Sequence, residues 1–187
     1  MFEIRWHGRG GQGAWTASNL LAQAALKEGK HVQSFPTFGP ERMGAPIMAF
    51  TRISDEDIEL HCNVYDPDVA IVLDPTLIKT VPVAEGVKEG GYILANYDKT
   101  PKEFAEELGI IGKGYKIYVT PATDIAVKIL GRPITNTAMI GALIKITKIV
   151  KIESMKQALK ERFPPKIAEL NIKVVEKAME KTRGERL

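Results

Sequence analysis

The sequence predicts an α/β protein in which helices cover both faces of a mostly parallel sheet. Strand and helix patterns alternate along most of the 187 residues. Residues 69–73 are apolar throughout, as in a central parallel strand covered on both faces. A glycine-rich turn at residues 8–13 separates a short strand pattern from a long helix pattern. We therefore expect one Rossmann-like three-layer domain over residues 1–187, with an antiparallel hairpin inserted into it.

Composition and charge are those of an ordinary globular protein. Hydrophobic residues make up 44% of the chain and charged residues 26%, with a net charge of +3 and the two signs interspersed. The sequence therefore shows no cluster of basic residues of the kind that nucleic-acid-binding proteins carry. Membrane helices need roughly 18 to 20 consecutive apolar residues, and neither such a run nor a signal segment is present. We expect a cytoplasmic protein with no nucleic acid or membrane partner.

Cysteine and histidine are too sparse for a metal site built by this chain alone. Cys62 is the single cysteine, whereas an iron–sulfur cluster usually takes about four. The three histidines have no paired spacing. His61 adjoins Cys62, but neighbours on a strand point to opposite faces, which disfavours a catalytic cysteine. We expect no metal ligand and no catalytic residue here.

The turn at residues 8–13 carries the strongest local signal. Gly8, Gly10 and Gly13 match the pattern G-x-G-x-x-G after the alternating apolar residues Phe2, Ile4 and Trp6. Glycine tolerates positive φ and lets backbone N–H groups approach a ligand, and a helix N-terminus favours an anion. Arg9 adds a full positive charge. The motif alone leaves open a phosphate or carboxylate site and a tight turn whose glycines only permit close packing.

The segment after the turn argues against a nicotinamide dinucleotide. A helix is expected over residues 13–28, with one apolar face, and a strand over 31–35 that ends at Pro36. A dinucleotide site carries Asp or Glu about 20 residues past the glycines. Gln33 and Ser34 occupy that position. We therefore still interpret the turn as a phosphate-binding turn, but not as part of a dinucleotide-binding motif.

The loop over residues 37–46 is the second candidate for function. It contains two prolines and two glycines, the apolar residues Phe38 and Met43, and the charged neighbours Glu41 and Arg42. Loops that mix turn formers, charges and apolar anchors often carry function, and the strongly apolar strand expected over 47–53 can hold this one in place. The alternative is a surface crossover with exposed charges; we favour function.

Two further features concern the middle of the chain. Ile58, Leu60 and Cys62 alternate after the acidic turn at residues 55–57, which predicts an antiparallel partner for strand 47–53. Asp74 follows strand 69–73, where ligands bind in open α/β sheets. It can also cap a short helix beginning at Pro75, and we favour this second role.

The rest of the chain predicts more alternating elements. Strands are expected over residues 91–96 and 115–119, and helices over 101–108, 121–130, 155–162 and 166–181. Thr120 is the expected cap of the second of these helices, and Ser154 opens a capping box before the third. Asn136 is the expected cap of a further helix that is apolar around most of its circumference and is therefore buried.

Three segments together resemble one family. They are residues 8–13, 38–46 and 136–143, with the sequences GRGGQG, FGPERMGAP and NTAMIGAL. In this order and spacing the chain resembles the gamma subunit of the 2-oxoacid:ferredoxin oxidoreductases, most closely the pyruvate or shared pyruvate/2-ketoisovalerate type. The resemblance runs nearly from end to end.

This resemblance implies a place in a multisubunit enzyme with alpha, beta and delta subunits. Such a complex oxidatively decarboxylates a 2-oxoacid, transfers the acyl group to coenzyme A (CoA), and passes electrons to ferredoxin. Thiamine diphosphate and iron–sulfur clusters belong to the partner subunits. The gamma chain covers the active site, is associated with CoA, and is not expected to be active alone.

The CoA-binding residues that we expect are the backbone and charge of the turn, a second cation, and polar groups at a helix start. They are Arg9, Gly10, Gly11, Gln12, Gly13, Arg42, Asn136 and Thr137. The planar fork of arginine suits phosphate bidentately. Two alternatives stay open: a purely structural subunit, and a free-standing nucleotide-binding reductase.

Overall fold

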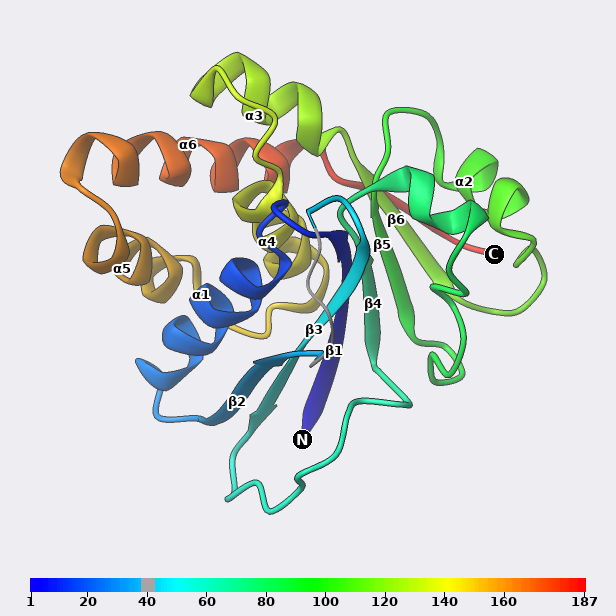
Figure 1. Ribbon diagram of the computed structural model, residues 1–187, viewed down its shortest axis with the longest axis horizontal. Coiled ribbons are helices and arrows are strands. Elements are labelled where there is room, and N and C mark those ends of the chain that lie inside the picture. The colour runs from blue at the N-terminus through cyan, green and yellow to red at the C-terminus, as the bar shows by residue number, and fades with distance from the viewer. Residues whose placement is uncertain (38–42) are drawn as a thin grey trace.

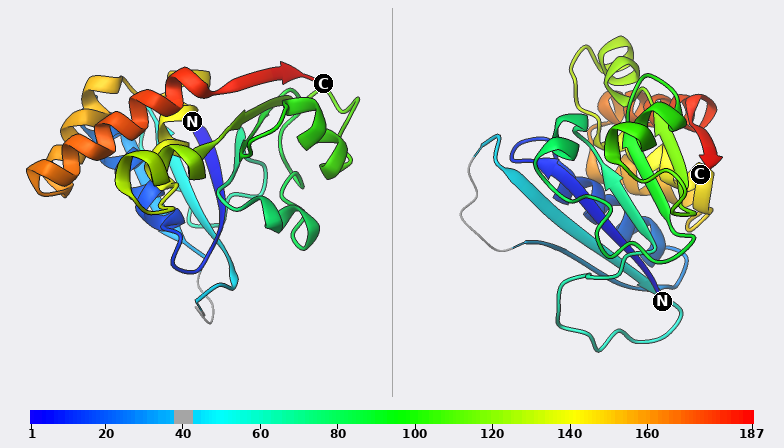
Figure 2. Two further views of the ribbon diagram at one scale, coloured as in Figure 1. Left: turned by 90° about the horizontal axis from the view of Figure 1, so that it is seen from above. Right: turned by 90° about the vertical axis from the view of Figure 1, so that its right-hand side faces the viewer.

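The computed structural model describes residues 1–37 and 43–187. Within them, seven strands form one mixed sheet with helices on both faces, which confirms the predicted fold class (Figures 1 and 2). The strands are β1 (Phe2–Arg9), β2 (His31–Pro36), β3 (Pro46–Ser54), β4 (Val69–Val72), β5 (Tyr92–Asn96), β6 (Lys116–Thr120) and β7 (Arg183–Arg186).

The described residues also form six α-helices and a short 3₁₀ helix. They are α1 (Ala14–Leu26), α2 (Pro101–Leu108), α3 (Ala122–Leu130), α4 (Asn136–Thr147), α5 (Ile152–Arg162), α6 (Pro165–Lys181) and the 3₁₀ helix η1 (Pro75–Lys79). None of these helices is long and apolar enough to cross a bilayer.

The sheet has a parallel centre with antiparallel edges. Its strand order is β2-β3-β1-β4-β5-β6-β7, and β1, β4, β5 and β6 run parallel. The β2–β3 hairpin joins β1 through antiparallel pairing of β3, and β7 pairs antiparallel with β6. The carboxyl ends of the four parallel strands therefore lie at one edge of the sheet, where ligands bind in open α/β folds.

Two apolar cores cover the two faces of this sheet. The larger core packs Trp6 and Leu94 of the sheet against α1, α4, α5 and α6, with Met139 and Val174 fully buried. The smaller core packs the opposite face against η1 and α2 through residues such as Phe104. Figure 1 shows α2 on one side of the sheet and α1, α4, α5 and α6 on the other.

Helix α4 is buried, as its apolar circumference predicted. Its residues 136–144 are all buried. At Gly141 an added Cβ would lie 2.4 Å from the carbonyl oxygen of Val175 on α6, so only glycine allows the two helix backbones to approach this closely. Residues 136–143, one of the three segments on which the family resemblance rests, thus contain a position of close helix packing.

The hairpin partner predicted at residues 58–62 is wrong. Those residues form no strand, and β3 pairs with β2 instead. The alternating Ile58, Leu60 and Cys62 do not face a core, since Leu60 and Cys62 are exposed. The segment instead crosses the sheet face, where the carbonyls of Ile58 and Leu60 accept hydrogen bonds from the Gln33 side chain.

Three predicted caps are also wrong, each by one to three positions. Helix α3 is capped at Pro121, so Thr120 stays on β6 and is fully buried. Helix α4 is capped at Thr135, which makes Asn136 its first residue. Helix α5 begins at Ile152, which places Ser154 inside its first turn.

Strand β7 has no sequence signal, because its four residues are all exposed and charged or glycine.

Candidate functional site at the glycine turn

The turn of residues 10–13 joins β1 to α1 and depends on glycine at two positions. Gly11 has φ of 92° and Gly13 has φ of 78°, a left-handed conformation that side chains disfavour. A Cβ added at Gly13 would also lie 2.7 Å from Nδ2 of Asn136. Gly13 is thus required both by its conformation and by the start of α4 behind it.

Gly8 serves packing. A Cβ added there would lie 3.3 Å from the Cβ of Ala14, the first residue of α1. The three glycines of the motif therefore do not share one role: Gly8 admits α1 close to the sheet, and Gly13 lets the chain turn into the helix. The close-packing interpretation accounts for part of the motif.

A carboxylate from the neighbouring strand braces the turn. Asp74, at the end of β4, accepts hydrogen bonds from Nε of Arg9 at 3.1 Å and from Nε2 of Gln12 at 2.8 Å. It also caps η1 by accepting from the Thr76 amide at 2.9 Å, which confirms the predicted cap. Arg9 reaches two more acceptors, the Gly44 carbonyl at 3.1 Å and the Thr76 hydroxyl at 2.8 Å.

Electrostatic interactions keep the carboxylate of Asp74 ionised. Burial alone would raise the pKa of Asp74, but hydrogen bonds from Thr76 and Gln12 and the charge of Arg9 outweigh it and leave the pKa below its ordinary value. The side chains of Arg9 and Asp74 are 28% and 13% exposed. The positive charge of Arg9 is therefore compensated, and its guanidinium fixes the shape of the turn.

The backbone amides of the turn divide into used and open groups. The Gly10 amide donates to the Ala45 carbonyl at 2.9 Å, and the Gln12 amide to the Arg9 carbonyl at 3.0 Å. Within residues 1–37 and 43–187, the amides of Gly11, Gly13 and the first three residues of α1 (14–16) donate to no other group. That first turn also contains no acidic residue. This arrangement of open amides at a helix N-terminus favours an anion.

A pocket of about 420 Å³ opens over these amides. Its wall is apolar: Trp15 is 50% exposed and Met43 is 93% exposed. The lining residues are Gly10, Gly11, Gly13, Ala14, Trp15, Thr16, Met43 and Ile47. The pocket thus pairs anion-binding amides with a hydrophobic surface, which suits a ligand that has a phosphate part and an apolar part.

The structure brings most of the predicted site residues together. Arg9 and residues 10–13 form the turn, and the Asn136 side chain lies against Gly13. Thr137 is fully buried, and its hydroxyl lies 2.9 Å from Oδ1 of Asn171 on α6, away from the turn. Arg42 lies outside the described residues.

Sequence reasoning did not find the ion pair between Asp74 and Arg9. The two residues are 65 positions apart, and they meet because β4 lies next to β1 in the sheet. The available signal was the position of Asp74 at the carboxyl end of a buried strand. Recognising the brace would also have required the strand order.

A buried polar pair lies behind the turn on β1. Nε of Arg5 donates to Nε2 of His7 at 3.0 Å, and both side chains are less than a tenth exposed. Burial and the charge of Arg5 lower the pKa of His7 to about 3, so this histidine is neutral at physiological pH. In the described part of the chain, no three His, Cys, Asp or Glu side chains are grouped to hold a metal ion.

The comparisons with known proteins agree with this fold. The model of the family described as pyruvate ferredoxin/flavodoxin oxidoreductase matches residues 3–181. The chain therefore belongs to the pyruvate ferredoxin/flavodoxin oxidoreductase family, as its three sequence segments predicted.

Individual relatives give the type of subunit. The chain is 53% identical over 182 residues to the pyruvate/ketoisovalerate oxidoreductases common subunit gamma of Thermococcus kodakarensis, covering 97% of both chains. It is 51% identical over 178 residues to the pyruvate synthase subunit PorC of Methanocaldococcus jannaschii, covering 95% of both. The crystal structure of pyruvate oxidoreductase subunit PORC from Thermotoga maritima superposes with a TM-score of 0.88 at 41% identity, covering 99% of this chain and 98% of that one. The chain is accordingly a gamma-type subunit of an oxidoreductase.

Proposed function

We propose that this gamma-type subunit belongs to a pyruvate or 2-ketoisovalerate:ferredoxin oxidoreductase, covers its active site and helps to bind CoA. The complex would convert the 2-oxoacid and CoA to acyl-CoA and CO₂ and pass the electrons to ferredoxin. The named relatives support the reaction: they are subunits of pyruvate or ketoisovalerate oxidoreductases. Alpha, beta and delta subunits would hold the thiamine diphosphate and iron–sulfur clusters, and the complex would be cytoplasmic.

One observation supports the CoA contact most directly: the open N-terminus of α1. The amides of Gly11, Gly13 and the first helical turn face a pocket, and within the described residues no side chain caps them. Phosphate oxygens of CoA would accept from these amides, as phosphates do at other glycine turns. Trp15 and Met43 would contact apolar parts of the same ligand.

The remaining predicted residues take different parts in this proposal. Arg9 and Gln12 hold the turn in shape through Asp74, and Gly10 anchors it to Ala45. Arg42 is proposed as the free cation on the strength of the sequence alone. Asn136 supports Gly13 from behind. Thr137 is not included among the ligand contacts, because its hydroxyl is bonded within the core.

Thr16→Glu in the reconstituted complex tests the proposal. Thr16 is the third residue of α1 and lines the pocket, so a carboxylate there would repel a phosphate. We expect the KM for CoA to rise about tenfold with kcat unchanged, while the chain itself gains about 0.5 kcal/mol because an acid suits a helix N-terminus. Arg42→Ala should raise the same KM without that gain in stability.

Ser154→Glu is the matched control, because Ser154 is the third residue of α5. It should leave the KM for CoA at the wild-type value. A normal KM in Thr16→Glu would contradict the proposal and would favour a purely structural subunit. Binding of a nicotinamide cofactor by the isolated chain would instead favour a free-standing reductase.

A further inference from the structure

Helix α1 has an outward face unlike that of a solvent-exposed helix. Residues 10–26 contain no Asp, Glu, Lys or Arg, yet Trp15 and Leu26 are 50% and 55% exposed. Helix α6 shows the usual alternative, since its outward positions are mostly charged. Its charged residues are Lys166, Glu169, Lys173, Glu176, Lys177, Glu180 and Lys181. Depletion of charge on an exposed surface is typical of the centre of a protein interface.

This uncharged face lines a depression between α1 and α5 that consists of adjoining hollows with shared lining residues. A hollow of about 180 Å³ borders the glycine-turn pocket through Trp15 and Thr16 and contains Asn19. A third hollow of about 430 Å³ joins it through Gln23 and Arg162 and ends beside Leu26. We call this depression, from Trp15 to Leu26 along α1, the α1 furrow.

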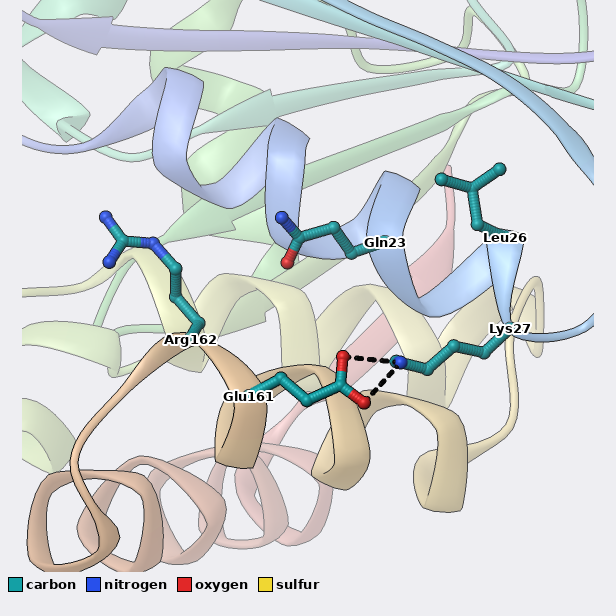
Figure 3. Close-up of a pocket in the computed structure, with 5 residues that line it drawn as sticks. All are labelled: Gln23, Leu26, Lys27, Glu161 and Arg162. Atoms are coloured by element: carbon teal, nitrogen blue, oxygen red, sulfur yellow. Dashed lines mark hydrogen bonds and ion pairs between the residues drawn. The ribbon is translucent and has the colours of Figure 1, made fainter.

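The charges beside the furrow leave one cation in excess. Nζ of Lys27 lies 2.6 Å from Oε2 of Glu161, so these two charges neutralise each other. Arg162 forms no ion pair with any residue in the described ranges, and its guanidinium lies 5.5 Å from the ring centroid of Phe163. Figure 3 shows Arg162 reaching from α5 toward α1, apart from the Lys27–Glu161 pair.

We infer that the α1 furrow is a docking surface for another subunit of the oxidoreductase. That partner would place apolar side chains against Leu26 and a carboxylate against Arg162. Tryptophan and arginine are among the residue types enriched at interfaces, and Trp15 and Arg162 line the same hollow of the furrow. The positive charge of Arg162 favours a partner that carries an acidic group at this position. This inference does not depend on the CoA proposal.

Two single variants in the full complex test it: Arg162→Glu and Leu26→Lys. Leu26 lies at the end of the furrow away from the glycine turn, and Arg162 lines its two hollows. Neither residue lines the glycine-turn pocket, so the two variants separate docking from CoA binding. We expect each variant to bind the remaining subunits at least about tenfold more weakly, measured as the Kd of the purified chain for the complex that lacks it. Thermal unfolding of each purified variant should stay near the wild-type midpoint, because both side chains are exposed.

Matched controls are Lys173→Glu on the charged face of α6 and Ile111→Lys, another exposed apolar residue at 48%. Both should bind the remaining subunits within about twofold of the wild type. Wild-type affinity in Arg162→Glu and Leu26→Lys would overturn the inference. It would also be overturned if the furrow variants only abolished self-association of the isolated chain. An altered KM for CoA in an otherwise normal complex would assign the furrow to the ligand instead.

Discussion

Helices α1 and α3 both begin at the carboxyl edge of the parallel sheet, and their N-termini are built in opposite ways. At α3, after β6, Oδ1 of Asn96 accepts from the Thr123 amide at 3.2 Å, and Asp124 adds a negative charge in the first turn. At α1, after β1, the described residues provide neither a side-chain cap nor an acid. Equivalent helix N-termini are thus capped at α3 and, within the described residues, uncapped at α1.

The difference comes from single residues on the neighbouring strands. Asn96 ends β5 and reaches across to α3, where it also donates to the Thr123 hydroxyl at 2.9 Å. Asp74 lies two residues after β4 and reaches across to the glycine turn, but it binds the side chains of Arg9 and Gln12 and does not bind the amides of α1. Asn96 therefore occupies an amide at the start of α3, whereas Asp74 leaves the amides at the start of α1 unoccupied.

Gly13→Ala should produce the largest effect, because it distorts the open N-terminus. The new Cβ would sit at positive φ and 2.7 Å from the Asn136 amide nitrogen. We expect a loss of about 3 kcal/mol in the free energy of unfolding, measured with denaturant. Gly29→Ala is the control: its φ is 75° with no atom within 4 Å of the added Cβ, so it should lose only about 1 kcal/mol. Equal losses at both positions would show that the contact with Asn136 is unimportant.

Asn96→Ala should open the closed N-terminus at α3. It removes three hydrogen bonds of a side chain that is 7% exposed, so the free energy of unfolding should fall by about 2 kcal/mol. The KM for CoA of the reconstituted complex should stay unchanged, because Asp124 still repels anions there. A changed KM would mean that CoA binds at α3 and not at the glycine turn.

Asp74→Asn should have the smallest effect, about 1 kcal/mol near pH 7, because asparagine keeps an acceptor but loses the charge facing Arg9. The pKa of Asp74 lies below its ordinary value in the folded chain, so its ionised form stabilises the fold above that value. This stabilisation is lost as the pH falls through the folded pKa. The stability difference between wild type and variant should therefore shrink below about pH 4. A difference that stays constant with pH would exclude the ion pair as its cause.

The sequence predicts those parts of the fold that depend on local pattern. The apolar run at residues 69–73, the glycine turn, Asp74 as a cap and the buried circumference of α4 are all local signals, and all are confirmed. The partner of β3 was predicted wrongly because alternation at residues 58–62 does not reveal whether those residues are buried. Strand β7 was missed because an exposed edge strand needs no apolar face.

The site was less predictable than the fold because its geometry depends on strand order. The sequence places Arg9 beside the glycines, but only the adjacency of β1 and β4 shows that Asp74 holds its guanidinium. Likewise, nothing local to Thr137 indicates that its hydroxyl faces Asn171 on α6. Arg42 lies outside the described residues, so its role stays a prediction.

The most direct test of the central claim is amide hydrogen exchange in the assembled oxidoreductase with and without CoA. At CoA concentrations that saturate activity, exchange at residues 11–16 should slow, while residues 121–125 at the start of α3 should exchange as before. Unchanged exchange at residues 11–16 under saturating CoA would contradict a CoA site at the glycine turn.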